Sequence, residues 1–462
     1  MSQLAFSSLK LRPELLGNLA TLDYAQMTPI QAQSLPQVLA GRDVIGQGKT
    51  GSGKTAAFAL GLLNRLDAKR FSVQSLVLCP TRELADQVAQ EIRKLARAIP
   101  NVKVLTLYGG VPYGPQIGSL EHGAHIVVGT PGRVLDHLEK GRLKLDALDA
   151  LVLDEADRML DMGFQEALDA IIERAPRQRQ SLLFSATYPE RIQSIARRLM
   201  RDPLMVKVEA THDNFSIQQH FFKVDDDRQR LMGLRLLLLK FLPESTLIFC
   251  NTKRETQAAA DYLREHGFSA LALHGDLEQR DRDQTLMRFA NKSASILVAT
   301  DVAARGLDIE SLDAVINYQV AHDPQVHVHR IGRTGRAGSR GLACTLWSGD
   351  EGHRVAQIEC ELDPIRDSKN LPGPNVLARP VMQPPNTTLQ ISAGKKQKIR
   401  PGDILGALTG EDGVPGKQVG KIHVADNWAY VAVHRSAGKA ALKKLGNGKL
   451  KGRSFRVRHI RH

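Results

Sequence analysis

The sequence predicts an α/β fold with two parallel-sheet domains in tandem, followed by a small, strongly basic domain. Short, continuously apolar runs alternate with amphipathic stretches through residues 40–345, and such runs are typical of parallel strands buried on both faces. The runs form two sets that separate near Asp202-Pro203. A proline cluster and then a rise in positive charge mark the third domain.

The expected strands are short apolar runs bounded by polar or turn residues. The first set comprises Asp43–Gly46, Ser75–Cys79, His125–Gly129, Ala150–Asp154 and Ser181–Ser185. The second set comprises Thr246–Cys250, Ser295–Thr300 and Ala314–Tyr318. Amphipathic helices are expected between the strands, for example over Leu84–Arg97 and Thr256–His266. Each sheet is therefore expected to carry helices on both faces.

The domain boundaries follow from composition. We expect domains over residues 1–208 and 209–365, a proline-rich linker over 366–390 and a basic domain over 391–462. Residues 394–462 hold 16 Lys or Arg against 4 Asp or Glu, a net +12 of the chain's +14. This concentration of charge is typical of a module that binds a polyanion, and a solvating charged surface is the alternative.

The bulk composition restricts the class of protein. With 462 residues, 42% hydrophobic and 24% charged, the chain is expected to form globular domains. No apolar run approaches the roughly 18 residues of a membrane span, and no secretory signal is visible, so a cytoplasmic protein is expected. The four cysteines are scattered, which indicates reduced thiols and no cysteine metal site.

Residues 48–55 read Gly-Lys-Thr-Gly-Ser-Gly-Lys-Thr, which fits the phosphate-loop pattern. The glycines allow a tight turn in which backbone N–H groups approach phosphate oxygens. Lys54 is expected to reach the β- and γ-phosphates, and the Thr55 hydroxyl to bind Mg²⁺. The residues expected to hold the nucleotide here are Gly51, Ser52, Gly53, Lys54 and Thr55.

Asp154 and Glu155 follow an apolar strand about a hundred residues after the phosphate loop. We expect Asp154 to bind Mg²⁺ and Glu155 to orient and deprotonate the attacking water. For this pair alone, a solvated turn at a strand end is the alternative. Together, the loop and the acidic pair predict a site that hydrolyses a nucleoside triphosphate.

Phosphoryl transfer also needs positive charge near the γ-phosphate. Residues 329–336 read His-Arg-Ile-Gly-Arg-Thr-Gly-Arg, and Arg333 and Arg336 would share one face of a helical turn. We expect these two arginines to stabilise the transition state. A basic surface turn is the alternative.

Together with further motifs in order, these segments make residues 6 to about 345 resemble a DEAD-box RNA helicase. The motifs include Met27-Thr28-Pro29-Ile30-Gln31, Pro80-Thr81-Arg82-Glu83, Gly109-Gly110, Thr130-Pro131-Gly132-Arg133, Asp154-Glu155-Ala156-Asp157, Ser185-Ala186-Thr187 and Ala299-Thr300-Asp301. At Gly48 the family usually has Ala, but the phosphate-loop pattern is kept. The resemblance implies two RecA-like domains that use ATP and Mg²⁺ and act on RNA.

The resemblance also implies roles around the nucleotide. Gln31 would read adenine, since an amide both donates and accepts, and this favours ATP over GTP. Phe6 would stack on adenine, with a core anchor as the alternative. Gly306 would contact the nucleotide and Asp308 the ribose. The residues that would couple hydrolysis to domain closure are Asp157, Ser185, Thr187 and His329.

Further positions resemble the family's RNA-binding motifs. They are small, hydroxylated or cationic, which suits phosphate and sugar contacts. In the first domain they are Thr81, Arg82, Gly110, Thr130 and Arg133, and in the second Thr252 and Thr300. An ion pair with Glu83 at the start of a helix is the alternative for Arg82.

The implied mechanism is ATP-gated clamping, because the loop and carboxylates lie in one domain and the arginines in the other. ATP and RNA would favour closure, which separates a short duplex locally. An ATP-regulated RNA clamp or scaffold without strand separation is the alternative, and a DNA helicase is a third.

In the basic tail we expect strands at Asp403–Leu408, Gly420–Val424, Trp428–His434 and Ser454–Arg458, and a helix at Ala437–Leu445. Trp428 and Tyr430 would share one strand face, as bases stacked on an RNA-recognition fold require. Partial burial is the alternative for both rings. A basic surface that includes Lys449, Lys451 and Arg453 is a second candidate for RNA binding.

The core followed by this basic RRM-like domain resembles the DbpA group of bacterial DEAD-box helicases. The resemblance implies that the tail binds a hairpin of 23S rRNA in the peptidyl-transferase region, during assembly of pre-50S particles. A monomer without membrane contact is expected.

Overall fold

The computed structural model describes residues 4–22, 24–48, 51–208, 217–304, 312–335, 341–361, 368–411 and 413–460. The chain divides into two compact units with a boundary near residue 211. The first unit holds one seven-stranded sheet, and the second holds a seven-stranded and a four-stranded sheet. Within the described residues, none of the helices is both long and apolar enough to cross a membrane.

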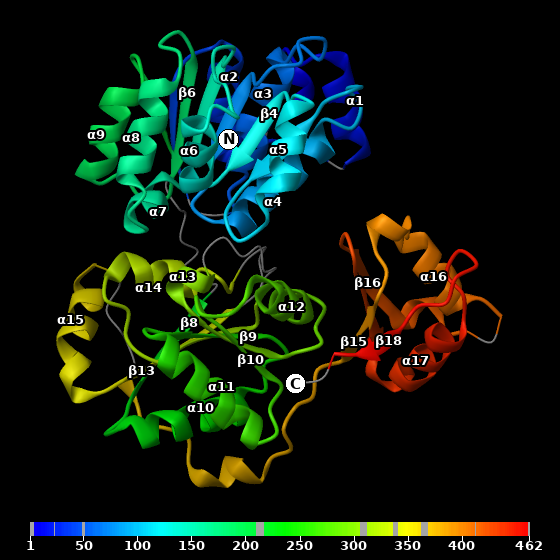
Figure 1. Ribbon diagram of the computed structural model, residues 1–462. Coiled ribbons are helices and arrows are strands. Elements are labelled where there is room, and N and C mark those ends of the chain that lie inside the picture. The colour runs from blue at the N-terminus through cyan, green and yellow to red at the C-terminus, as the bar shows by residue number, and fades with distance from the viewer. Residues whose placement is uncertain are drawn as a thin grey trace. The chain divides into compact units, whose positions relative to one another are not determined.

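The first domain is a parallel sheet with strand order β3-β4-β2-β5-β6-β1-β7, covered by helices (Figure 1). Its strands are β1 (Val44–Gln47), β2 (Ser75–Leu78), β3 (Val104–Leu107), β4 (Ile126–Gly129), β5 (Ala150–Asp154), β6 (Gln180–Ser185) and β7 (Leu204–Lys207). Its helices are η1 (Phe6–Ser8), α1 (Pro13–Thr21), α2 (Pro29–Leu39), α3 (Lys54–Arg65), α4 (Arg82–Leu95), α5 (Tyr113–Glu121), α6 (Pro131–Glu139), α7 (Ala156–Asp161), α8 (Gln165–Arg174) and α9 (Glu190–Leu199).

Two apolar clusters explain why the central strands are apolar throughout. Alternate strand residues pack on α1 to α4 on one face, and the others pack on α6 to α9 on the opposite face. Val152 and Leu153, for example, belong to different clusters and are both fully buried. The edge strands β3 and β7 were not predicted; β3 has two half-buried positions, and β7 has two exposed ones.

The second domain repeats this design with strand order β10-β11-β9-β12-β13-β8-β14, again parallel. Its strands are β8 (Ile217–Lys223), β9 (Thr246–Cys250), β10 (Ala270–Leu273), β11 (Ile296–Thr300), β12 (Ala314–Asn317), β13 (Gly341–Trp347) and β14 (Ser368–Lys369). Its helices are α10 (Asp227–Phe241), α11 (Lys253–Glu265), α12 (Gln279–Ala290), α13 (Asp301–Ala304), α14 (Pro324–Ile331), η2 (Gly349–Glu351), α15 (Gly352–Glu361) and η3 (Pro374–Ala378). The predicted β9, β11 and β12 are present, and β8, β10, β13 and β14 are additional.

The C-terminal domain is an antiparallel sheet, β16-β17-β15-β18, with two main helices. Its elements in order are β15 (Asn386–Ile391), η4 (Lys395–Gln397), α16 (Pro401–Thr409), η5 (Gly416–Gln418), β16 (Val419–Val424), β17 (Ala429–His434), η6 (Arg435–Ala437), α17 (Gly438–Asn447) and β18 (Val457–His459). This is the βαββαβ order of ferredoxin-like folds. The predicted fold class, two RecA-like domains and a small α+β domain, is confirmed.

The strand predicted at Asp403–Leu408 is wrong, because this segment lies within helix α16. Pro401 takes the first helical position, and the Arg400 backbone N–H donates to Asp403 Oδ2 at 2.7 Å. Ile404 and Leu408, four residues apart, are both fully buried. The short apolar run was therefore assigned the wrong period.

The segment predicted as a linker contains regular structure. Val376 of η3 is 7% exposed and packs on the core of the second domain. β15 begins at Asn386 and pairs with both β17 and β18, so it is a central strand of the last sheet. Leu389 and Ile391 alternate into the core of that domain.

Candidate functional site

Three neighbouring strands of the first sheet, β5, β6 and β1, bring the predicted nucleotide site to one edge. The carboxyl ends of parallel strands meet at the same edge, where ligands of open α/β sheets bind. Asp154 ends β5, Ser185 ends β6, and the phosphate loop follows β1. The Gly48 backbone N–H donates to Ser185 O at 3.1 Å, which joins the loop to β6.

Of the phosphate loop the structure describes Gly48 and residues 51–55, which lead into α3. Gly51 and Gly53 have φ of +82° and +94°, the left-handed region that favours glycine. Lys54 is 6% exposed, and its ammonium donates a short hydrogen bond to Gly48 O. The Ser52 hydroxyl is buried and has no hydrogen-bond partner among the described residues. These features fit a phosphate ligand, because the loop offers a cation, a hydroxyl and the start of a helix.

Asp154 and Glu155 are both nearly buried, at 3% and 8% exposure. Burial, and then the negative charge of Glu155, raise the pKa of Asp154 to about 7, while Lys54 lowers it. Glu155 has φ of +53°, so the chain turns sharply between β5 and α7. A divalent cation would favour the ionised form of this carboxyl pair, and carboxylate and hydroxyl oxygens are ligands that Mg²⁺ accepts.

Asp157 joins the acidic segment to the Ser-Ala-Thr segment. Its Oδ2 accepts from both Thr187 N, at 3.0 Å, and Thr187 Oγ1, at 2.9 Å. Its backbone N–H donates to Ser185 Oγ at 3.3 Å. The structure therefore brings these three predicted coupling residues into direct contact.

The two predicted adenine contacts differ in their surroundings. The Gln31 amide bridges the α2 start and the phosphate loop, because Oε1 accepts from Thr28 N at 2.9 Å and Nε2 donates to Gly53 O at 3.0 Å. A side-chain amide has one further donor and one further acceptor site beyond these two bonds. Phe6 is 2% exposed and packs edge-on against Tyr24. That geometry supports the alternative of a core anchor for Phe6, and stacking on adenine stays a prediction.

The predicted RNA contacts of the first domain follow the other half of the same sheet edge, after β2, β3 and β4. Arg82 donates to Gly109 O at 3.2 Å and lies over Tyr108, 5.4 Å from the ring centre. Gly110 has φ of +75°, and a Cβ there would clash with the Arg82 guanidinium. Thr81 and Thr130 precede α4 and α6 as N-cap residues.

Arg133 continues this row of cationic groups. It lies 3.9 Å from the centre of the Tyr113 ring and donates to Gln116 Oε1 at 3.1 Å. Its guanidinium also donates to Val111 O at 3.2 Å. The structure thus gathers all five predicted positions along one edge, which suits contacts with a nucleic-acid backbone.

A buried arginine that sequence reasoning did not assign, Arg330, organises the second domain. It is 1% exposed and forms a bidentate pair with Asp301, at 2.8 and 2.7 Å. The same side chain donates to Asn251 Oδ1 at 2.8 Å and to Gln319 O at 2.9 Å. The position of Arg330 in the arginine segment was the sequence feature that could have pointed to it, but its burial depends on tertiary packing.

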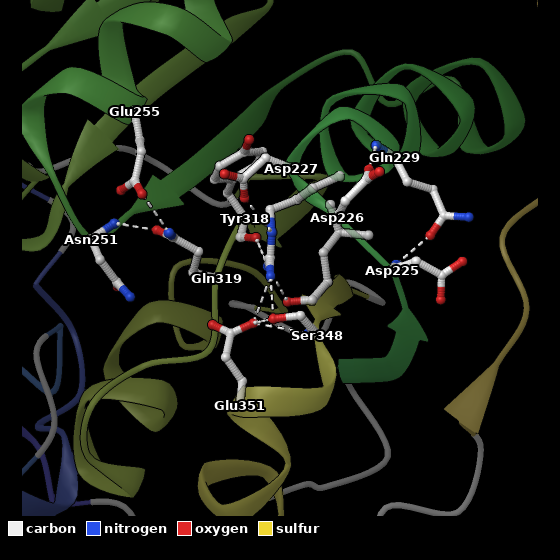
Figure 2. Close-up of polar contacts among 12 residues, drawn as sticks. Asp225, Asp226, Asp227, Gln229, Asn251, Glu255, Tyr318, Gln319, Ser348 and Glu351 are labelled. Carbon is white, nitrogen blue, oxygen red and sulfur yellow. Dashed lines mark hydrogen bonds and ion pairs between the residues drawn. The ribbon is translucent and has the colours of Figure 1, made fainter.

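This network reaches the start of α11. Figure 2 shows Gln319 between Asn251 and Glu255, with its Oε1 accepting from Asn251 N at 3.0 Å and its Nε2 donating to Glu255 Oε1 at 2.7 Å. Glu255 Oε2 also accepts a hydrogen bond from the Thr252 hydroxyl at 2.7 Å. The predicted RNA contact Thr252 is therefore held by a chain of hydrogen bonds that begins at Arg330.

A second buried arginine, Arg230, supports the same loops from α10. It pairs with Glu351 at 2.7 Å and donates to Tyr318 O at 2.6 Å. Figure 2 shows Glu351 beside Ser348, whose hydroxyl donates to it at 3.0 Å. The ends of β12 and β13 are thereby tied to α10.

The other predicted residues of the second domain have separate positions. Thr300 ends β11, and its Oγ1 accepts from Ala303 N at 3.4 Å. His329 lies in α14, whereas Arg333 follows the end of that helix at Ile331. Helix α14 therefore ends before Arg333, so Arg333 does not lie on a helical turn as predicted. Gly306, Asp308 and Arg336 lie outside the described residues.

In the C-terminal domain, Trp428 and Tyr430 face residues of α12. The Arg280 guanidinium lies 5.0 Å from the centre of the Trp428 ring. Tyr430 is 8% exposed, and burial raises its pKa while a side-chain hydrogen bond with Gln284 lowers it. This arrangement matches the alternative of partial burial for Tyr430, and base stacking stays a prediction.

The second candidate surface of this domain stays accessible. Lys449, Lys451 and Arg453 are all exposed, around the turn that precedes β18. Lys451 lies 3.2 Å from Asp403 Oδ2. Exposed basic groups on one turn suit contacts with phosphates.

Three family descriptions match the chain. They are DEAD/DEAH box helicase over residues 28–195, helicase conserved C-terminal domain over 230–338 and DbpA RNA binding domain over 388–459. The ATP-dependent RNA helicase DbpA of Escherichia coli is 54% identical over 458 residues, which cover 99% of this chain and 100% of the relative. The DEAD-box ATP-dependent RNA helicase CshA of Geobacillus kaustophilus is 44% identical over 77% of this chain and 76% of its own length.

A solved structure agrees with these sequence matches. The chain is similar to Saccharomyces cerevisiae Dbp5 bound to RNA and ADP BeF3, with 29% identity and a TM-score of 0.71 over 80% of this chain and 95% of the other. Fold and carboxyl-edge site together define an ATP-hydrolysing enzyme that acts on RNA. The chain belongs to the DEAD-box family of ATP-dependent RNA helicases, and its last domain is a DbpA RNA-binding domain.

Proposed function

We propose that this helicase remodels 23S rRNA in pre-50S particles in the cytoplasm, acting as a monomer whose last domain binds a hairpin of the peptidyl-transferase region. One observation carries the proposal: a relative of the DbpA group matches the whole chain at 54% identity, including the RNA-binding domain. The net +12 of residues 394–462 supports an RNA anchor.

The proposed chemistry is hydrolysis of the γ-phosphate by water. Glu155 accepts a proton from the water as its oxygen attacks phosphorus, and ADP leaves. Lys54 binds the β- and γ-phosphates. Mg²⁺, held by Thr55 and Asp154, would neutralise phosphate charge. Arg333 and Arg336 add positive charge from the second domain.

We propose that Asp157 carries the coupling between hydrolysis and RNA. It contacts Ser185 and Thr187 directly and lies two residues after Glu155. A change at the acidic segment therefore reaches the β6 end through hydrogen bonds. Thr81, Arg82, Gly110, Thr130 and Arg133 lie on the same sheet edge and would contact the RNA backbone.

The test is the steady-state ATPase rate with a panel of RNAs. The panel holds 23S rRNA, a peptidyl-transferase hairpin, unrelated RNA of equal length and DNA of the same sequence. Selective stimulation by 23S rRNA and its hairpin is expected. Equal stimulation by every RNA would remove the ribosomal target, and equal stimulation by DNA would remove the RNA preference.

Two variants sharpen this test. Glu155→Gln is expected to lower the ATPase rate by about 10²–10⁴-fold while RNA binding persists. A chain that ends before Asn386, where β15 begins, is expected to keep an ATPase without rRNA preference. Tight ATP-dependent RNA holding without duplex separation would favour the clamp alternative.

A further inference from the structure

A cavity of about 700 Å³ lies in the second unit, lined by residues of the second domain and of the C-terminal domain. Its lining holds five basic side chains and no Asp or Glu within the described residues. The basic side chains are Arg264, Arg288, Arg435, Lys439 and His459. A concave lining whose ionisable side chains are all basic is the electrostatic setting in which an anion binds.

Arg288 of α12 is the most informative of these side chains. It is 7% exposed, and no hydrogen bond or ion pair involves its guanidinium in the described part of the chain. Burial lowers its pKa, and the charge of Arg264 lowers it further. Buried arginines are normally paired with an anion. A guanidinium held in this way is prepared for an anionic ligand.

The start of α17 contributes to the same cavity. Gly438, its first residue, and Lys439 both line the cavity. No side chain caps this end, and the first turn contains no acidic residue. The Gly438 N–H donates to Arg435 O, so the N–H groups that follow it are the ones through which this helix start would bind an anion. Gly438 also allows close packing, because a Cβ there would lie 2.8 Å from Thr387 Cγ2.

Hydrogen bonds connect the two walls of the cavity. The hydroxyls of Ser293 and Thr388 lie 2.7 Å apart in a buried contact. Asn386 donates through Nδ2 to Asn291 O at 3.0 Å and through its backbone N–H to Lys292 O at 3.2 Å. The two walls that carry the basic groups are thus joined around one cavity, and Arg264 also pairs with Asp261.

We propose that this cavity binds a phosphate of the RNA backbone, through Arg288, Arg264, Lys439 and the start of α17. The volume exceeds that of one phosphate group, so a sugar or a neighbouring nucleotide fits beside it. Arginine and helix starts are the usual phosphate ligands. RNA bound there spans both domains, so it links the RNA-binding domain to the helicase core. The inference rests on the proposed RNA-anchoring function.

The test uses the full chain with Arg288→Met, which removes the charge and keeps much of the apolar stem. Binding of a labelled 23S rRNA hairpin with single-stranded flanks is measured by fluorescence anisotropy from 50 to 200 mM salt. We expect about tenfold weaker binding and a salt slope smaller by about 0.7–1, the value of one phosphate contact. The matched control is Arg228→Met, an exposed arginine of α10 outside the cavity.

Two further measurements keep the outcome clear. Thermal unfolding of the free Arg288→Met protein is expected at or above the wild-type temperature, since a buried unpaired charge is removed. If that variant unfolds, Lys439→Met replaces it, because Lys439 is exposed. Unchanged affinity and salt slope in both variants, with wild-type binding intact, would overturn the inference.

Failure of the broader proposal gives a different result. If the wild-type chain shows no preference for the 23S hairpin, the ribosomal target fails, and the cavity is tested with an unrelated hairpin. Inorganic phosphate and AMP serve as competitors. If micromolar phosphate or AMP makes the RNA affinity of the wild-type chain equal to that of Arg288→Met, the cavity binds a free anion. That result would overturn the RNA assignment.

Discussion

Asp301→Asn leaves the Arg330 charge buried without its counter-ion. Breaking a buried ion pair from one side costs about 3–5 kcal/mol. Asp301 retains 21% side-chain exposure, and Arg330 keeps its bonds to Asn251 and Gln319, so the lower limit applies. We expect a loss of about 3 kcal/mol in the unfolding free energy of the second domain.

Urea unfolding followed by tryptophan fluorescence measures this loss. Trp347 ends β13, and the other tryptophan, Trp428, is replaced by Phe in every variant. With a slope of about 2 kcal/mol/M, the midpoint falls by about 1.5 M. Asp227→Asn is the matched control, because Asp227 forms a weak, solvent-exposed ion pair: its side chain is 95% exposed, and its Oδ1 lies 3.9 Å from Arg230 Nε. If both variants shift the midpoint equally, the proposed role of the buried pair is refuted.

The remaining predictions concern coupling, pH and docking. Asp157→Asn replaces the acceptor of two Thr187 hydrogen bonds. A charged hydrogen bond contributes about 1.5–3 kcal/mol, so we expect the ratio of RNA-stimulated to basal ATPase rate to fall by about tenfold or more. An unchanged ratio would show that Asp157 does not couple the two activities. Burial and then the charge of Arg330 lower the pKa of His327 to about 4. As pH falls below 6.5, His327 therefore becomes protonated in the unfolded chain but stays neutral in the folded chain, which destabilises the fold. The second domain should lose about 2 kcal/mol between pH 7.5 and pH 5, and His327→Phe should remove that dependence in urea unfolding; an equal loss in the variant contradicts the assignment. Asn386→Ala removes the side-chain bond to Asn291 O, and we expect faster proteolysis between the second and C-terminal domains; unchanged cleavage would show that this contact does not hold them.

The sequence alone was sufficient for the parts of the protein that depend on local chemistry. The phosphate loop, the acidic segment and the central strands follow from patterns within a few residues, because a buried parallel strand must be apolar on both faces. Because the carboxyl ends of parallel strands lie at one edge of the sheet, Asp154, Ser185 and the phosphate loop come together there. For this reason the fold class and most of the nucleotide site were predicted.

Residues with unusual partners were decided by tertiary structure. Phe6 packs against Tyr24, and Tyr430 is buried beside α12, whereas the sequence left both stacking and burial open for each ring. Residues 403–408 became a helix because capping and i, i+4 burial outweighed a short apolar run. In each case the deciding contact comes from distant parts of the chain or from the helical period.

The buried arginines show the same division most clearly. In the sequence, Arg288 and Arg330 are ordinary basic residues in helical segments, and such residues are usually expected to be exposed to solvent. In the structure, Arg330 is enclosed by Asp301, Asn251 and Gln319, whereas Arg288 faces a basic cavity. Burial and partners are properties of the packed chain, because they depend on which segments meet. Local pattern therefore determined the fold and the ATP chemistry, and tertiary packing alone decided where charge is buried and where an anion is received.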